Sequence, residues 1–161
     1  MPRIILGIDP GVADTGFGVI TQVKHELTAL DYGSIQTQSK QPMANRLEHI
    51  FTAVEKLIKK YKPEIVAVEQ IFFHTNVTTA MAVSQARGVI LLAAARHRLT
   101  TLDCTPLQVK QALSGYGRAD KRQIQTLVKI MLKLKTMPKP DDAADALAVA
   151  ICCAHSRSKL K

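Results

Sequence analysis

Residues 3–11 read RIILGIDPG, a short apolar run that ends in an acidic residue and a Pro-Gly pair. The run from Arg3 to Ile8 is rich in β-branched side chains, and Asp9-Pro10-Gly11 is a strong turn signal, so the segment predicts a buried strand that ends at a carboxylate. The same pattern returns at residues 64–69, EIVAVE, where another short apolar run ends in Glu69. The prediction for the rest of the chain starts from these two strands.

The segments around these strands predict a sheet covered by helices. Residues 16–23 and 27–37 have the partial alternation of two further strands, and residues 99–104 form a fifth. Helical spacing of apolar residues predicts helices over 43–61, 79–98, 106–113, 120–134 and 141–155. Three strands in succession, before strands and helices alternate, indicate a five-stranded mixed sheet flanked by helices, an α/β fold that resembles ribonuclease H.

One predicted helix differs from the others in its composition. Residues 79–98 are apolar on almost every side of the helix, whereas the helix over 120–134 has an apolar stripe opposite a basic one. A helix that is apolar all round is a buried helix. We therefore expect residues 79–98 to lie inside the domain or against a second subunit.

Composition restricts the class of protein. The 161 residues, 47% of them hydrophobic, suffice for one domain that spans the chain and buries roughly 70% of its unfolded surface, with a tail that frays after about residue 155. The absence of an apolar run of about 18 residues argues against a membrane span, and the early first strand leaves no room for a signal peptide. Three cysteines without CxxC spacing predict neither disulfides nor a zinc site and favour the cytoplasm.

The charge of the chain is positive and unevenly distributed. The formal net charge is +9, and residues 96–135 hold nine basic residues against two acidic ones, a net charge of +7. A basic pI can simply aid solubility, but a surplus concentrated in one quarter of the chain indicates a basic face. Such a face favours a polyanionic partner, for which nucleic acid is the usual candidate.

The last predicted helix adds a second pair of carboxylates, because Asp142 and Asp145 are three residues apart and share a face of the helix. Sites in open α/β sheets form at the carboxyl ends of neighbouring strands, where Asp9 and Glu69 are predicted to lie. If the helix crosses this end of the sheet, four carboxylates converge, and their repulsion raises their pKa values. Divalent cations relieve that repulsion, and oxygen ligands suit Mg²⁺ or Mn²⁺.

Each carboxylate also has a purely structural interpretation. Asp9 can serve only to begin a Pro-Gly turn, and Glu69 can be a surface residue at the end of a strand. Asp142 and Asp145 can serve only to complement the positive end of a helix dipole. The catalytic interpretation is favoured because all four occur together in a basic chain, a combination typical of phosphoryl chemistry with two metal ions.

Five segments of the chain resemble the RuvC family of Holliday junction resolvases, in the order found in that family. They are residues 5–11 (ILGIDPG) with Thr15-Gly16, Glu69-Gln70, residues 85–88 (QARG), residues 108–110 (QVK) and residues 142–147 (DAADAL). The resemblance covers nearly the whole chain, and its last motif is the most specific part. It implies an endonuclease that resolves four-way DNA junctions in recombination and repair. It also implies a homodimer that cooperates with the RuvA–RuvB branch-migration complex.

The resemblance also implies roles for individual residues. Asp9, Glu69, Asp142 and Asp145 match the catalytic carboxylates and would bind two Mg²⁺ ions, with Mn²⁺ as a substitute; some family members have a histidine at the position of Asp142. The candidate DNA-binding residues are Phe72, Phe73, Asn76, Arg87, Lys110, Arg118 and Lys121. One phenylalanine would stack on an unpaired base near the opened junction, for about 1–3 kcal/mol. The alternative for both phenylalanines is a place in the core.

The implied reaction is in-line hydrolysis of a phosphodiester, in which one metal ion activates water and a second, ~4 Å away, stabilises the leaving oxygen. Three other classes of protein are alternatives. A sugar-kinase or actin-like nucleotide binder begins with a segment like GIDPG, but it needs two such halves. A YqgF-type ribonuclease is shorter and lacks the long basic helical segment. A catalytically silent junction-binding module has no need of the complete carboxylate set.

Overall fold

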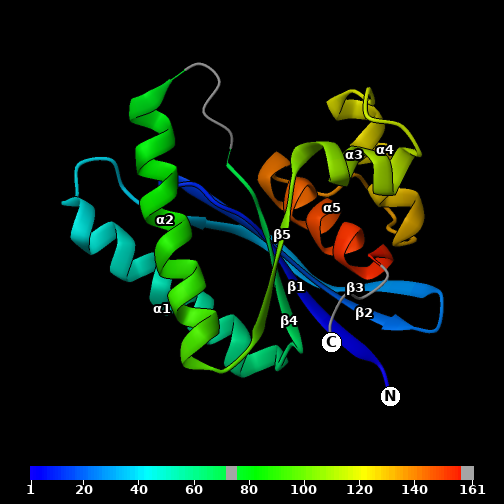
Figure 1. The fold of residues 1–161 in the computed structure, drawn as a ribbon, viewed down its shortest axis with the longest axis horizontal. Coiled ribbons are helices and arrows are strands. Elements are labelled where there is room, and N and C mark those ends of the chain that lie inside the picture. Colours follow the sequence, from blue (N-terminus) through cyan, green and yellow to red (C-terminus); the bar gives the residue numbers. More distant parts are fainter. Residues whose placement is uncertain (72–75, 157–161) are drawn as a thin grey trace.

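A computed structural model describes residues 1–71 and 76–156 of the chain. The strands are β1 (Arg3–Asp9), β2 (Asp14–Val23), β3 (Glu26–Gln36), β4 (Ile65–Glu69) and β5 (Thr100–Cys104). The helices are α1 (Met43–Tyr61), α2 (Val77–Arg96), α3 (Pro106–Ser114), α4 (Lys121–Met131) and α5 (Asp141–His155), as Figure 1 shows. The predicted order of strands and helices is confirmed. The predicted frayed tail lies, from residue 157 on, outside the described residues.

The strands form the five-stranded mixed sheet that the sequence predicted, and their order in the sheet is β3-β2-β1-β4-β5. β1 pairs antiparallel with β2 on one side and parallel with β4 on the other, so the strand direction changes at β1. The parallel register pairs Gly7 with Ala67 and Ile8 with Val68. The next residues, Asp9 and Glu69, therefore end neighbouring strands at the same edge of the sheet.

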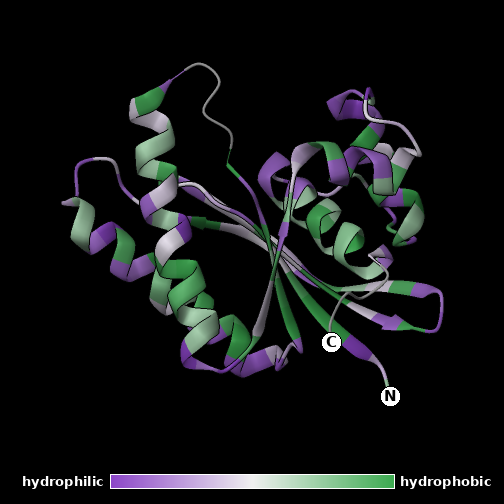
Figure 2. Cartoon of the chain, in the orientation of Figure 1, coloured by the Kyte–Doolittle hydropathy of each residue, from purple (hydrophilic) through white to green (hydrophobic). Residues whose placement is uncertain are grey.

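Alternating side chains of the central strands point into two cores, one on each face of the sheet. Ile5 and Ile65 pack with α5, α3 and α4 on one face, while Leu6 and Val66 pack with α1 and α2 on the other. Figure 1 shows the two groups of helices on opposite sides of the sheet, and Figure 2 shows that the central strands and α5 are rich in hydrophobic residues. The period-2 pattern of a strand buried on both faces accounts for this division.

Three predicted ends of α2 and α4 are wrong for local reasons. α2 ends at Arg96 and not at residue 98, where Arg98 has a left-handed φ of 55°. α4 ends at Met131 and not at residue 134, because Leu132 is its C-cap and Lys133 has a left-handed φ of 54°. α2 begins two residues earlier than predicted, because the Asn76 side chain caps it by accepting a hydrogen bond from the backbone N–H of Thr79, at 3.2 Å. Asparagine is a favoured N-cap residue.

The chain alone does not bury α2 on all sides. Its buried residues are Ala80, Ala86, Ile90, Ala93 and Ala94, which lie on one side of the helix. On the other side, the exposed fractions are 66% for Val77, 59% for Met81 and 53% for Leu92. By length and composition α2 could cross a membrane, but this is weak evidence, because its buried side packs on the sheet as a core helix does. The expectation of a helix buried inside the domain is therefore wrong, and the second-subunit alternative stays a prediction.

Candidate active site

The carboxyl ends of β1 and β4 bring two of the predicted carboxylates together. Asp9 ends β1 and Glu69 ends β4, both half-buried, and the two carboxyl groups are close enough for Glu69 to raise the pKa of Asp9. The turn after Asp9 is fixed by the fully buried Thr15, whose hydroxyl donates to the carbonyl oxygen of Gly11 at 2.5 Å. The segment that the sequence predicted as a turn thus also holds Asp9 against β2.

The other two carboxylates reach this edge because α5 lies directly on the backbone of the sheet. Gly7 of β1 faces the carbonyl oxygen of Ala146, and a Cβ at Gly7 would overlap that oxygen. A Cβ at Gly16 of β2 would likewise overlap the carbonyl oxygen of Asp142. Because Gly7 and Gly16 have no side chains, α5 can approach β1 and β2 closely. Its first turn therefore lies over the end of β1.

Asp9, Asp142 and Asp145 consequently form a compact cluster. One carboxylate oxygen from each lies within 4.8 Å of the corresponding oxygens of the other two. Glu69 lies outside this group of three but close to it, because its charge raises the pKa of Asp9 and the charge of Asp145 raises the pKa of Glu69. The structure therefore brings together all four carboxylates that the sequence singled out.

The electrostatics of the cluster oppose its ionisation. Burial and the neighbouring carboxyl groups of Glu69 and Asp142 raise the pKa of Asp9 to about 8. Burial and the charge of Asp9 raise the pKa of Asp145 to about 6. Burial also raises the pKa of Glu69 and of Asp142, with added repulsion from Asp145 on Glu69 and from Asp14 on Asp142. Without a bound cation, the carboxyl groups of the cluster therefore resist full ionisation near neutral pH.

A divalent cation fits this donor set. The candidate ligands are all carboxylate oxygens, which suit hard cations such as Mg²⁺, Mn²⁺ and Ca²⁺. Three of them already converge within the reach of one ion. A bound cation would offset the repulsion that raises the four pKa values, because it favours the ionised form of each carboxyl group.

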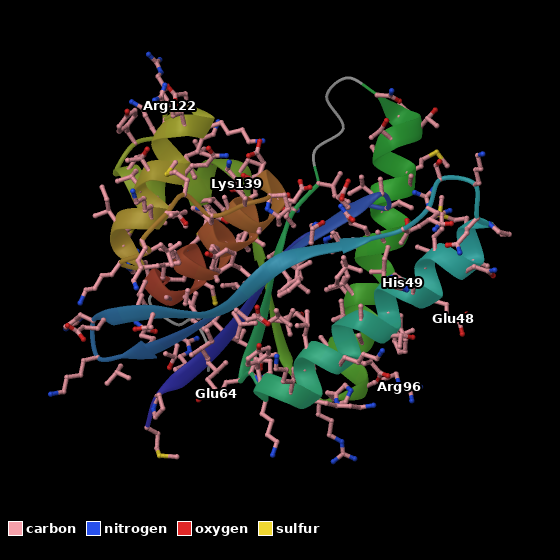
Figure 3. All side chains as sticks on the ribbon, turned by 180° about the vertical axis from the view of Figure 1, so that it is seen from behind. Glu48, His49, Glu64, Arg96, Arg122 and Lys139 are labelled. Carbon is pink, nitrogen blue, oxygen red and sulfur yellow. The ribbon has the colours of Figure 1, made fainter. Side chains whose placement is uncertain are left out.

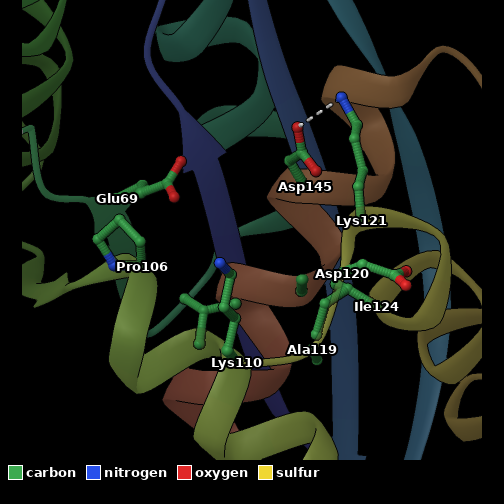
Figure 4. A pocket seen from close by; sticks show the side chains of 10 residues that line it. Glu69, Pro106, Lys110, Ala119, Asp120, Lys121, Ile124 and Asp145 are labelled. Atoms are coloured by element: carbon green, nitrogen blue, oxygen red, sulfur yellow. Dashed lines mark ion pairs between the residues drawn. The ribbon is translucent and has the colours of Figure 1, made fainter. Parts of the chain in front are cut away.

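Two lysines flank the carboxylates across a cavity of about 240 Å³. Lys110 of α3 lies near Glu69 and lowers its pKa, and Lys121, the first residue of α4, lies 4.0 Å from the Oδ2 atom of Asp145. Figure 4 shows the cavity with Glu69 on one side, Asp145 and Lys121 on the other, and Lys110 beneath them. The cavity therefore combines acidic and basic side chains in the way that a site for a phosphate and its metal ions requires.

The other candidate DNA-binding residues lie in different places. Arg118 is exposed in the connection between α3 and α4, close in sequence to Lys121. Asn76 is exposed and caps α2. Arg87 of α2 forms an ion pair with Asp103 of β5, and its Nε atom is buried without a hydrogen-bond partner among the described residues. Phe72 and Phe73 fall outside the described residues.

Two carboxylates near the site were not assigned a role from the sequence. Asp141 lies 3.4 Å from the Nζ atom of Lys121 and accepts a hydrogen bond from Gln125 at 3.2 Å. Asp14, at the start of β2, accepts hydrogen bonds from Ser34 and Gln36 and raises the pKa of Asp142. The helical spacing of Asp141 and Asp145 gave a signal for the first. Asp14 had no such signal, because its proximity to Asp142 depends on the packing of α5 on β2.

The fold and the carboxylate cluster together define a ribonuclease H-like nuclease. Residues 5–153 match the family model described as crossover junction endodeoxyribonuclease RuvC, and the chain belongs to this family. It is 57% identical over 153 residues to the crossover junction endodeoxyribonuclease RuvC of Heliobacterium modesticaldum and 54% identical to that of Alkaliphilus metalliredigens. Each match covers 95% of this chain and at least 93% of the relative.

A solved structure supports the same assignment. Thermus thermophilus RuvC in complex with its Holliday junction substrate superimposes with a TM-score of 0.90 at 35% identity, over 94% of this chain and 93% of that one. The expected ribonuclease H-like fold and the resemblance stated from the sequence motifs are therefore confirmed.

Proposed function

We propose that this chain resolves four-way DNA junctions by paired, symmetric nicking, with Asp9, Glu69, Asp142 and Asp145 as catalytic carboxylates and two Mg²⁺ ions as its metals. Mn²⁺ would substitute for Mg²⁺ because it also prefers oxygen ligands. The observation that carries the proposal is the convergence of carboxylates from β1, β4 and α5 beside Lys110 and Lys121. It is supported by the family and by the complex of the Thermus thermophilus relative with a Holliday junction.

The chain's own residues would bind and orient the scissile phosphate. Asp9, at the centre of the cluster, would hold the cations between β1 and α5, with Glu69 and Asp145 on either side. Bound divalent cations would stabilise the negative charge that develops on the attacking and leaving oxygens. Lys110 and Lys121 would fix the phosphate between these carboxylates, because an ammonium group near the cavity neutralises a phosphate oxygen that the carboxylates repel.

The wider DNA contact is proposed from charge and position. Arg118 is exposed beside the site and would neutralise phosphates of the junction arms, with the release of counterions. Asn76 and Arg87 belong to the proposed DNA-binding set as well. Arg87 would have to exchange its ion pair with Asp103 to contact DNA. The stacking role of Phe72 or Phe73 is carried by the family resemblance alone.

We further propose that the enzyme acts as a homodimer, with α2 as much of the contact. A two-fold symmetric dimer matches the symmetry of a four-way junction and would place two sites on two strands of like polarity. The exposed Val77, Met81 and Leu92 of α2 support this choice of surface. The partnership with RuvA and RuvB is proposed from the family. The cytoplasm is proposed because Cys104, Cys152 and Cys153 are free thiols.

The test compares two glutamates at opposite ends of β4, namely Glu69, which ends the strand, and Glu64, which precedes it. Glu69→Gln should lower the cleavage rate of a mobile four-way junction in Mg²⁺ by about 10²–10⁴-fold, because metal-assisted charge stabilisation contributes several kcal/mol. Junction binding should survive, since affinity comes mainly from the basic residues. Glu64→Gln is the matched control, because Glu64 precedes the opposite end of β4 and is exposed (Figure 3).

The rates are measured under single-turnover conditions and the affinities by fluorescence anisotropy without divalent metal. Asp9→Asn should behave as Glu69→Gln does. Cleavage by Glu69→Gln at the wild-type rate would contradict the site assignment. Cleavage of a linear duplex as readily as of the junction, by the unmodified protein, would contradict the proposed substrate.

A further inference from the structure

The connection between α3 and α4 presents an exposed aromatic ring beside the basic residues. Tyr116 lies in this connection, within the segment Ser114-Gly115-Tyr116-Gly117, and 47% of it is exposed. Arg118 follows two residues later, and Lys121 begins α4 and borders the cavity of the carboxylates. The chain has only three tyrosines, four phenylalanines and no tryptophan, so an aromatic residue exposed at this place needs an explanation.

The backbone on both sides of Tyr116 has a defined path. Gly115 ends α3 in the left-handed conformation, with φ of 81°, and its N–H donates to the carbonyl oxygen of Gln111. Gly117 packs on the side chain of Leu107, so closely that a Cβ at this position would overlap the Cδ1 atom of Leu107. The connection is therefore packed against α3, and Tyr116 projects from it between two glycines.

Side-chain hydrogen bonds hold Tyr116 at both ends. The hydroxyl of Ser114 lies 2.7 Å from the carbonyl oxygen of Tyr116 and 3.4 Å from its backbone nitrogen. The phenol hydroxyl lies 3.4 Å from the Oε1 atom of Gln123, which also accepts from the N–H of Asp120 in the capping box of α4. The ring is thus tethered to the first turn of α4, while much of its surface stays open to solvent.

Burial does not explain this tyrosine, because the ring contributes to neither of the two cores. The charge near the start of α4 favours a polyanion as the occupant, because Arg118, Lys121 and Arg122 lie there in sequence and Lys110 lines the same cavity as Lys121. An aromatic face among cationic side chains is the combination by which proteins bind single-stranded nucleic acid.

We propose that Tyr116 is a stacking platform for a nucleobase of the junction strand that passes the carboxylate site. The proposal rests on the proposed function and adds a second DNA contact, from the helical segment α3–α4, to the contacts already described. The lysines and Arg118 bind the phosphates, whereas Tyr116 binds an unpaired base at the crossover. By binding this base, Tyr116 would hold the DNA strand in place without contacting the scissile bond.

The test uses full-length protein with the Glu69→Gln substitution, so that binding is measured without cleavage. The probe is a synthetic four-way junction with 2-aminopurine at each base next to the crossover in turn. Tyr116→Ala should weaken junction binding by roughly 10-fold or more, the loss expected for one base–aromatic stack. It should also abolish the quenching of 2-aminopurine at one position. Tyr116→Phe should keep both the affinity and the quenching, because the ring remains.

A salt titration separates stacking from phosphate binding. Tyr116→Ala should leave the slope of log K against log salt unchanged, since a stacked base releases no counterion. Arg118→Ala should reduce that slope by about 0.9 for one phosphate contact in duplex DNA. Ile130→Ala is the control for loss of an exposed apolar side chain, because Ile130 is 65% exposed on α4.

Three results would overturn the proposal. They are wild-type affinity of Tyr116→Ala, an equal loss in Tyr116→Phe, and a changed salt slope in Tyr116→Ala. The melting temperature of Tyr116→Ala should be close to that of the parent. Tyr116→Leu keeps an apolar side chain but removes the ring, so it should bind as weakly as Tyr116→Ala. The parent's preference for the junction over a linear duplex is measured in the same series. If the parent does not prefer the junction over the duplex, the proposed function fails. If the parent prefers the junction but Tyr116→Ala binds it as tightly, only the Tyr116 proposal fails.

Discussion

Helices α2 and α5 are both rich in apolar residues, yet the chain buries them to very different extents. Eleven of the fifteen residues of α5 are buried, against five of the twenty residues of α2. α5 lies between the sheet and the pair α3 and α4, whereas α2 packs on the sheet and α1 from one side only. Figure 1 shows α5 between the sheet and the pair α3 and α4, and α2 beside α1 on the other side of the sheet.

The difference shows that an apolar helix is buried only where elements cover both of its sides. The chain provides both layers for α5, and the enclosure fixes the N-terminal part of the helix, with Asp142 and Asp145, against the end of β1. For α2 the described residues provide one layer. An apolar face of this kind on a protein that binds a symmetric substrate is well suited to a second copy of the chain. The following predictions test whether the two helices differ as this comparison requires.

Gly7→Ala should have the largest effect on the fold. A Cβ at Gly7 would overlap the carbonyl oxygen of Ala146 and lie 2.7 Å from the backbone nitrogen of Ala150, so α5 would have to move away from β1. Overpacking of this kind costs about 1–3 kcal/mol or more. Urea unfolding should report that loss, and cleavage should fall with it, since Asp145 moves with α5. A free energy of unfolding within 0.5 kcal/mol of wild type (about the level of an ordinary surface change) would contradict the close packing.

Leu92→Lys should separate the subunits and leave the fold intact. Leu92 is 53% exposed in the chain alone, so a lysine there meets solvent in the monomer but an apolar surface in the proposed dimer. We expect the dissociation constant of the dimer to rise by about tenfold or more, because burying an unpaired charge in an interface costs several kcal/mol. Sedimentation velocity measures the change, and circular dichroism should show the wild-type helix content.

Ile130→Lys is the matched control for this change. Ile130 is 65% exposed on α4, far from α2 in the fold, so the same substitution should not alter the dimer. Equal dissociation in both variants, or a stable Leu92→Lys dimer, would contradict α2 as the interface.

The carboxylate cluster of β1 and α5 should make the metal-free protein less stable as the pH rises. The folded-state pKa values of Asp9 and Asp145, about 8 and about 6, lie above the ordinary value of 3.8, so the native state holds protons that the unfolded chain has lost. Stability is therefore highest below about pH 4 with respect to these groups, and it falls as the pH rises through about 6 and about 8.

In EDTA, the melting temperature should fall by about 2–4 °C per kcal/mol lost between pH 5 and pH 8.5. The Asp9→Asn variant should show a smaller fall, because its side chain does not ionise. Added Mg²⁺ should raise the melting temperature most at pH 8.5, since a cation binds the ionised carboxylates. A melting temperature that rises with pH more steeply in the wild type than in Asp9→Asn would contradict the sign of these shifts.

Local patterns in the sequence predicted the fold and the four carboxylates. The bounds of α1 and α5 agree with the periodicity of their apolar residues, and Asp9 and Glu69 lie where the two apolar runs end. These features depend on neighbours in sequence, so a pattern reveals them. The position of α5 across the end of β1 depends on packing, which no local pattern shows. The family motif over residues 142–147 nevertheless indicated it, because it grouped Asp142 and Asp145 with the other two carboxylates.

Features that depend on distant contacts could not be predicted. The approach of Asp14 to Asp142 follows from the contact of Gly16 with α5, and no spacing in the sequence encodes that contact. The exposed side of α2 was missed for a related reason. Apolar composition indicates that a surface will be covered, but it does not tell whether the cover comes from the same chain or from another.

Gly88→Ala should have the smallest effect on the fold and the opposite sign from Gly7→Ala. Gly88 lies in the middle of α2, and a Cβ added there meets no atom within 4 Å in the described part of the chain. Replacing an exposed helical glycine by alanine stabilises a helix by up to about 1 kcal/mol. In the monomeric Leu92→Lys background, urea unfolding should therefore show a gain of this size.

In the otherwise unchanged dimer the added methyl group should instead weaken association, because Gly88 lies between Met81 and Leu92 on the exposed side and would be covered by the partner helix. A gain in stability with an unchanged dimer would place the contact elsewhere on α2, and a loss of stability in the monomer would show that the chain itself covers Gly88.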